Sequence, residues 1–162
     1  MFNKKKLRLL DLLNFWLDNR FIDVQTGCRL GEINNLKWEN ITNDTIEFNG
    51  KTGNRFFPLN DNLKELLEEI PEQNEYFLAN ENGLWLGAAN RLTKLIKNFM
   101  KKAELPDHFV THSLRHTFCS HLVINGVDLY KVSKLVGHSN ITTTQRYAHL
   151  NPSLLKISTK YF

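Results

Sequence analysis

The sequence predicts an α+β protein that is mainly α-helical, with one small antiparallel β-sheet. Over most of the chain, apolar residues recur at three- and four-residue spacing, which is typical of amphipathic helices. One stretch, residues 45–59, instead contains two short β-type runs around a turn rich in Asn and Gly. A chain of 162 residues is long enough to bury a core, so we expect one domain over residues 1–162.

The first part of the chain is predicted to be helical. Leucines fall at helical spacing over residues 3–18, and the pattern continues towards Gly27, as one helix or as two with a break between. A short helix should open just after Gly27, with Ile33 on its buried face and Glu32 on its first turn. Arg29 would then lie at or near the start of that helix.

The runs "TIEF" and "RFFPL" are predicted to pair as a β-hairpin. The segment "NGKTGN" between them supplies Asn and Gly residues, which adopt the positive φ angles that a hairpin turn needs. We therefore expect Lys51 at the tip of the hairpin or on its flank.

Further helices are predicted after the hairpin, each with a polar cap or a glycine at one end. Asp61, Asp128 and Ser139 are suited to cap the first, fourth and fifth of them, and Gly126 to end the third. These helices cover approximately residues 62–70, 87–102, 113–125, 128–136 and 140–149.

Composition excludes some classes of protein and leaves others open. No apolar run approaches the length of about 18 residues that a membrane span requires, and no signal-peptide pattern opens the chain, so we expect a cytoplasmic protein. Cys28 and Cys119 lack CxxC spacing, which favours reduced, partly buried thiols over a disulfide or zinc site. The net charge of +4 fits a nucleic-acid partner and equally fits many other soluble proteins.

The string "THSLRHTFCSHL" is the most unusual local pattern. In a helix His112 and Arg115 lie three residues apart and share a face, so an imidazole and a guanidinium could converge on one small anion. An isolated HxxR is more often a polar helix end, so this motif alone favours the structural interpretation.

Other segments change that balance. "TGCRLGEINNLKW" contains Arg29 after a glycine, "NGKTGNRFFPL" contains Lys51, and "GHSNITTTQRYAH" contains His138 and Tyr147. Each has an ordinary explanation when taken alone, as an ion-pair partner, a turn lysine, a helix-end histidine or a core aromatic. Their joint occurrence, in this order, is improbable by chance.

Together these segments resemble the catalytic domain of the tyrosine recombinases, the phage-integrase family. The resemblance runs from about residue 24 to residue 150. It implies the DNA breaking-rejoining fold and site-specific cleavage and rejoining of double-stranded DNA through a 3′-phosphotyrosine, with no metal, ATP or other cofactor. The positions that match the family pattern are Arg29, Lys51, His112, Arg115, His138 and Tyr147.

The chemistry of a phosphodiester supports the same residues. Charge develops on the non-bridging oxygens during transfer, and the planar forks of Arg29 and Arg115 can bond those oxygens while staying charged at any working pH. A tyrosine beside cationic groups can lose its proton and act as nucleophile, which is the part expected of Tyr147.

The resemblance assigns the remaining parts. Lys51 would protonate the leaving 5′-oxygen, and Glu32 would brace an active-site cation. His112 is a candidate for proton transfer at the tyrosine and His138 for a hydrogen bond to a non-bridging oxygen, but the sequence does not separate these two roles. The other histidines are expected to be structural or on the surface: His108, His116, His121 and His149. Among them, a supporting role on the phosphate side is conceivable for His116, because its neighbour is Arg115.

The resemblance also sets expectations about assembly. Family members carry an N-terminal DNA-binding module that completes a clamp on DNA, and we expect this core-binding domain to be absent from the chain. The tail "AHLNPSLLKISTKYF" either closes the domain's own core or docks on a neighbouring protomer in a DNA-bound homotetramer, with a monomer expected in free solution. A type IB topoisomerase-like enzyme, and a DNA-binding module without catalysis, are the alternatives.

Overall fold

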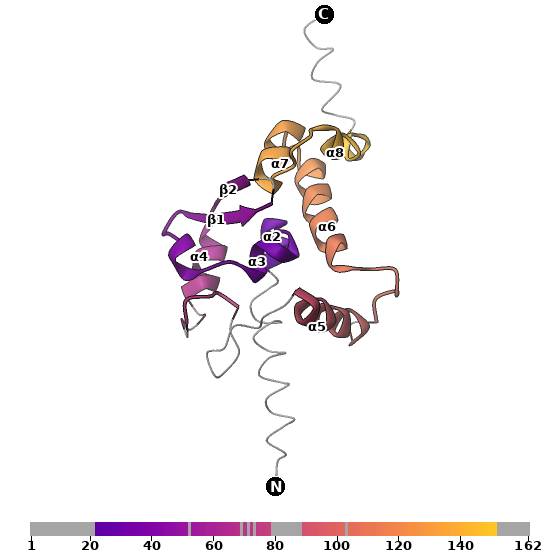
Figure 1. The fold of residues 1–162 in the computed structure, drawn as a ribbon. Helices are drawn as coiled ribbons and strands as arrows, with labels where there is room; N and C mark the ends of the chain where they lie inside the picture. The colour runs from indigo at the N-terminus through magenta and orange to yellow at the C-terminus, as the bar shows by residue number, and fades with distance from the viewer. Residues whose placement is uncertain are drawn as a thin grey trace, which may run out of the picture.

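The computed structural model describes residues 22–51, 53–68, 70, 72, 74–78, 89–102 and 104–151. The helix predicted over residues 3–18, the start of the helix predicted from residue 87, and the tail from residue 152 lie outside the described residues. In chain order the elements, drawn in Figure 1, are α2 (Ile22–Thr26), α3 (Leu30–Asn34), η1 (Trp38–Asn40), β1 (Thr45–Gly50), β2 (Gly53–Pro58), α4 (Asp61–Glu68), α5 (Ala89–Lys102), α6 (Thr111–Ile124), α7 (Leu129–Val136), α8 (Thr142–Gln145) and η2 (Ala148–Leu150).

The predicted fold class is confirmed in the described residues, which are mainly helical and contain one two-stranded antiparallel sheet. Strands β1 and β2 pair from Thr45 with Pro58 to Gly50 with Gly53. Lys51 follows the last pair directly and is exposed at the tip of the hairpin, as predicted. Gly53 has a φ of +107°, a value that the turn can use because glycine lacks a Cβ.

Two predicted helix caps differ from the structure. The helix α4 is capped by Asn60 rather than Asp61, because the Asn60 Oδ1 accepts the backbone N–H of Leu63 at 2.8 Å. Near the end of the chain α8 begins at Thr142 and its N-cap residue is Ile141, so Ser139 does not cap it. The Asn140 side chain instead accepts the backbone N–H of Thr142 at 2.9 Å, the short-range bond by which asparagine favours a turn.

The single helix predicted over residues 140–149 is also wrong. The segment forms one turn of α-helix, α8, and one turn of 3₁₀-helix, η2. The backbone N–H of Tyr147 bonds the Thr144 carbonyl at 3.0 Å, three residues back, so the α-helical pattern does not continue. Tyr147 therefore lies at the junction of two short helices.

Other predicted boundaries hold. Asp128 caps α7, with its side chain accepting the backbone N–H groups of Tyr130 and Lys131. Gly126 follows α6 with a φ of +86°. The backbone at these positions is set by local side-chain chemistry, which is why the sequence alone locates it.

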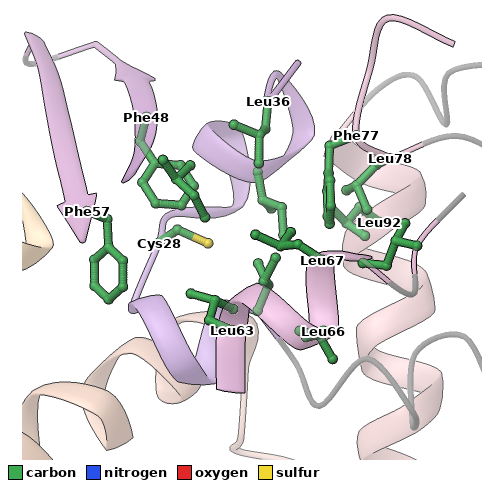
Figure 2. Packing of buried hydrophobic residues seen from close by; sticks show 14 of the residues in the cluster. Cys28, Leu36, Phe48, Phe57, Leu63, Leu66, Leu67, Phe77, Leu78 and Leu92 are labelled. Atoms are coloured by element: carbon green, nitrogen blue, oxygen red, sulfur yellow. The ribbon is translucent and has the colours of Figure 1, made fainter. Parts of the chain in front are cut away.

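Buried apolar side chains form two clusters on either side of α6. The main core packs α2 to α5 against the hairpin, and Figure 2 shows Cys28, Leu36, Phe48 and Leu63 converging there. The second cluster, the tyrosine core, contains Cys119, Val123, Val132, Val136 and Tyr147. In Figure 1, α6 runs from beside α5 to beside α7 and α8, and Phe118 on this helix packs against both clusters. Cys28 and Cys119 are free and buried.

Within the part of the chain that the structure describes, no helix is both long enough and apolar enough to span a membrane.

Candidate active site

Arg115 on α6 is the most deeply buried cation of the site, with 3% of its surface exposed. Its Nη1 donates to the carbonyl of Gly27 at 2.6 Å and its Nη2 to that of Val136 at 2.5 Å. It thereby ties the loop before α3 to the end of α7. Burial, followed by the charge of Arg29, lowers the pKa of Arg115 to about 10, so the guanidinium is charged at neutral pH.

Arg29 is the N-cap residue of α3, and its side chain crosses to the same end of α7. Its Nη2 donates to the carbonyl of Gly137 at 2.7 Å. The two arginines predicted as a phosphate clamp are thus bonded to consecutive carbonyls, those of Val136 and Gly137, directly before His138. Gly137 ends α7 with a left-handed φ of +69°.

Glu32, which is 3% exposed, lies between Arg29 and a third arginine, Arg55 of β2. Its carboxylate accepts the backbone N–H and Nη1 of Arg29, both at 2.8 Å, and Nη2 of Arg55 at 2.9 Å. Burial by itself would raise the pKa of Glu32, but the hydrogen bond and charge of Arg55, together with the bonds from Arg29, outweigh burial and lower it. The carboxylate therefore stays ionised between two guanidinium groups.

Sequence reasoning missed Arg55. Its Nη1 donates to the carbonyl of Leu135, and its guanidinium lies over the Phe48 ring at 4.4 Å from the centroid. A Cβ on Gly137 would approach the Arg55 Cδ to 2.7 Å, so only a glycine fits there without a shift. The available signal was the period of two along β2, which turns Arg55 to the same inward face as Phe57. We call Arg29, Glu32, Arg55 and Arg115 the arginine cluster.

His138 lies at the edge of the arginine cluster. Its Nδ1 is hydrogen bonded to the Thr144 hydroxyl at 2.7 Å, and Thr144 is fully buried. Burial, followed by the charges of Arg115 and Arg29, lowers the pKa of His138 to about 4. The imidazole is therefore neutral at pH 7 and can exchange hydrogen bonds without adding charge.

Tyr147 is 6% exposed and forms part of the tyrosine core. Its hydroxyl is hydrogen bonded to the Nδ1 of His116, one residue after Arg115 on α6. Burial, followed by the neighbouring Cys119 thiol, raises the pKa of Tyr147 to about 12, although the charges of Arg146 and Arg115 act in the opposite direction. We call Tyr147, His116 and Cys119 the tyrosine cluster.

His116 is the second residue that sequence reasoning did not place. It was expected to be structural or on the phosphate side, and the structure puts it against the tyrosine instead. Successive residues of a helix point about 100° apart, so Arg115 can face the arginine cluster while His116 faces Tyr147. The motif contained the residue, but only the packing of α6 against the last turns reveals its partner.

The two other predicted residues lie at the rim. His112 is exposed on the first turn of α6, with its ring edge-on to that of His116 at 4.9 Å between centroids. Lys51, at the hairpin tip, lines a groove together with Arg29 and Glu32. The remaining histidines are exposed: His108, His121 and His149.

Arg29, Arg55 and Arg115 thus gather at the end of α7, and Tyr147 is held by the residue after Arg115. The family pattern predicts this arrangement for Arg29, Arg115 and Tyr147. The sequence model described as the phage integrase family matches residues 21–153, and the chain belongs to this family. The predicted family is thereby confirmed.

Individual relatives agree with that assignment. Tyrosine recombinase XerD of Staphylococcus aureus is 32% identical over 162 residues, which cover 91% of this chain and 55% of the relative. The solved catalytic domain of bacteriophage HP1 integrase has a TM-score of 0.69 and 29% identity, with 99% of this chain and 93% of that chain covered. The XerH site-specific recombinase bound to difH substrate, in a pre-cleavage complex, has a TM-score of 0.67 and 28% identity, covering 85% of this chain and 44% of the other. The chain spans about half the length of the curated relatives it matches.

Proposed function

We propose that this chain is the catalytic domain of a site-specific DNA recombinase or integrase, which cleaves and rejoins DNA strands through a 3′-phosphotyrosine on Tyr147. The observation that carries the proposal is the anchoring of Arg29 and Arg115 on the consecutive carbonyls of Val136 and Gly137, beside a phenol held by the residue after Arg115. Family membership and the near-complete coverage of the HP1 integrase catalytic domain support it. That coverage also supports a single catalytic domain over residues 1–162.

The arginine cluster binds the scissile phosphate. Carbonyl bonds fix both clamp arginines, and a guanidinium has further N–H donors with which to bond the non-bridging oxygens. His138, neutral at pH 7, donates one more hydrogen bond to a non-bridging oxygen. Because these donors are fixed before the substrate arrives, little reorganisation opposes the transition state.

Catalysis exchanges one phosphate ester for another. The Tyr147 oxygen forms a bond to phosphorus, the bond from phosphorus to the 5′-oxygen breaks, and Lys51 gives that oxygen a proton. His112, exposed on the first turn of α6, is a further candidate for a hydrogen bond to the same phosphate. A 5′-hydroxyl of another strand then reverses the step, and since the phosphotyrosine conserves the ester bond, rejoining needs neither ATP nor a metal.

Two residues position the clamp without touching the substrate. Glu32 neutralises part of the charge of Arg29 and Arg55, which otherwise repel each other. Arg55 lies on β2 and donates hydrogen bonds to Glu32 of α3 and to the Leu135 carbonyl of α7. It thereby joins the hairpin to the helix end on which the clamp is anchored.

The partner of this site is double-stranded DNA, and the similarity to the XerH site-specific recombinase solved with its difH substrate supports a site of this kind. In the family's manner, the chain acts in DNA recombination or integration for a phage or other mobile element, in the cytoplasm of a bacterium or of an infected host. It is a monomer in free solution and forms a homotetramer on DNA through its C-terminal tail, with further DNA contacts made by the family's N-terminal module.

The test uses nicked duplexes in which the core sequence is randomised, because the target sequence is unknown. Cleavage next to the nick releases a short fragment, so the protein stays covalently attached and can be isolated on a denaturing gel. We expect an adduct from the wild-type chain at high protein concentration and none from Tyr147→Phe. Sequencing of the captured strands then gives a defined duplex for kinetic work.

Each other outcome has its own meaning. Binding without any adduct would contradict catalysis and favour a DNA-binding module. Relaxation of supercoiled DNA without strand exchange between sites would favour a topoisomerase-like activity. An adduct that persists in Tyr147→Phe would contradict the assignment of the nucleophile.

A further inference from the structure

In the proposed reaction the Tyr147 hydroxyl must lose its proton to some other group. A phenol with a pKa of about 12 is ionised in only roughly one molecule in 10⁵ at pH 7. Tyr147 is also 6% exposed within the tyrosine core, so little water reaches its hydroxyl. A protein group in contact with the hydroxyl must therefore accept the proton as the phosphorus bond forms.

We propose that His116 is the general base of strand cleavage, and that its Nδ1 accepts the Tyr147 proton while the phenolic oxygen bonds to phosphorus. This inference rests on the proposed function and extends it to a residue that the family resemblance does not assign. On this proposal His116, and not His112, takes part in proton transfer at the tyrosine.

The contacts of the neighbouring groups favour His116. Its Nδ1 is the atom hydrogen bonded to the Tyr147 hydroxyl, whereas the Nδ1 of His138 is bonded to Thr144. The Cys119 thiol adjoins the phenol, but burial raises its pKa, so it is not available as a thiolate base. His112 meets the ring of His116 edge-on from the solvent side.

The protonation state of His116 fits an acceptor. Burial, followed by the charges of Arg146 and Arg115, lowers its pKa, so the ring is neutral at pH 7 and Nδ1 can carry a lone pair. The titratable and charged groups near it are His112 and Arg115 on its own helix, and Tyr147 and Arg146 on the last turns. The surrounding positive charge is balanced in the complex by the phosphate, whose negative charge grows in the transition state.

The step balances in both directions. In cleavage the O–H bond of Tyr147 breaks, its proton moves to His116, the oxygen bonds to phosphorus, and the leaving 5′-oxygen takes a proton from Lys51. In rejoining the 5′-hydroxyl attacks and returns a proton to Lys51, and His116 returns its proton to the departing phenolic oxygen. No other reactant is required.

The direction of the hydrogen bond can be measured without DNA. In the 162-residue chain labelled with ¹⁵N-histidine, we expect the Nδ1 resonance of His116 at pH 7 to be that of an unprotonated nitrogen accepting a hydrogen bond. Tyr147→Phe removes the hydroxyl and should shift this resonance towards that of a free imidazole nitrogen. A protonated Nδ1 in the wild-type chain would overturn the proposal.

The catalytic role is tested by single-turnover cleavage of the duplex selected in the adduct assay. His116→Asn places an amide oxygen near the position of Nδ1, so it can still hold the hydroxyl but cannot take its proton. We expect cleavage to be slower by about 10²-fold or more. His121→Asn, an exposed histidine further along α6, is the matched control and should cleave at the wild-type rate.

A sulfur-substituted duplex separates the base from the acid. When sulfur replaces the bridging 5′-oxygen, the leaving group is a thiolate that needs no proton, so the duplex should rescue Lys51→Ala. His116→Asn should stay slow, because its defect lies at the attacking oxygen. Rescue of His116→Asn, or cleavage at the wild-type rate on the normal duplex, would overturn only the role of His116. Absence of an adduct from the wild-type chain would overturn the proposed function itself.

Discussion

The arginine cluster and the tyrosine cluster both include residues of α6, but the two are held in different ways. In the arginine cluster, charged groups from α3, β2 and α6 are bonded to one buried carboxylate and to the carbonyls of Gly27, Leu135, Val136 and Gly137. In the tyrosine cluster, a neutral phenol lies among apolar side chains, is bonded to one neutral imidazole and adjoins a thiol.

This difference separates two requirements of the proposed reaction. Charge that stabilises the phosphate is useful only if it is fixed beforehand, and the arginine cluster fixes it by long-range bonds within the core. A nucleophile must be protected until the substrate arrives, and the tyrosine cluster keeps it protonated. Four predictions test the comparison, from the largest expected effect to the smallest.

Arg115→Lys should have the largest effect, a loss of about 10²- to 10³-fold in the rate of adduct formation. A lysine retains the charge but cannot reach the carbonyls of Gly27 and Val136 with a planar fork and also bond the phosphate. Single-turnover cleavage of the selected duplex measures the rate. Arg146→Lys, at an exposed position, is the control, and an equal loss in both variants would contradict the special geometry of Arg115.

Glu32→Gln should destabilise the fold by about 3 kcal/mol, because it leaves two partly or fully buried guanidinium groups without their counter-charge. Urea denaturation followed by circular dichroism gives the free energy of unfolding. Glu75→Gln removes the partner of an exposed ion pair with Lys37 and should leave that free energy almost unchanged. Similar losses in both variants would show that the arginine cluster is not the stabilising network described above.

His138 should make the fold sensitive to acid. The pKa of His138 is about 4 in the folded state, against an ordinary value of 6.5. Between these two pH values, His138 therefore binds a proton in the unfolded chain but not in the folded chain. The free energy of unfolding should therefore be constant above pH 6.5 for this group and fall as the pH is lowered from 6.5 towards 4.

His138→Asn removes the titrating group but can still meet the Thr144 hydroxyl. We expect denaturation curves at several pH values to show a shallower loss of stability between pH 6.5 and 4 in this variant. The same slope in both proteins would assign the acid sensitivity to other groups.

Tyr147→Phe should have the smallest effect on stability, about 1 kcal/mol or less, because it removes one hydroxyl and retains the ring in the tyrosine core. The same variant abolishes the adduct in the proposed mechanism. Thermal and urea unfolding measure the change in stability. A loss as large as that of Glu32→Gln would mean that the tyrosine cluster is a structural network like the arginine cluster.

Local features of the fold could be predicted from the sequence. The hairpin and its Lys51 tip, the Asp128 cap and the location of Arg29 before a short helix all depend on residues within a few positions of each other. Where neighbouring polar residues could both begin a helix, as Asn60 and Asp61 can, the pattern did not distinguish them.

The missed residues depend on contacts between distant segments. Arg55 bonds residues 23 and 80 positions away, and His116 bonds a tyrosine 31 positions away. A period of two places Arg55 on the inward face of β2, but no local pattern indicates that the Glu32 carboxylate lies next to it. The contact of His116 depends on how α6 packs against the last turns, which the order of motifs does not encode.

The most direct test of the central claim is to identify the residue that holds the DNA. The adduct formed on the selected duplex is digested with nuclease and trypsin, and the peptides are fragmented in a mass spectrometer. Trypsin cuts after Arg146 and after Lys156, so the predicted product is the peptide of residues 147–156 carrying a nucleotide on Tyr147. A nucleotide on any other residue, or an adduct that leaves this peptide unmodified, would contradict the account.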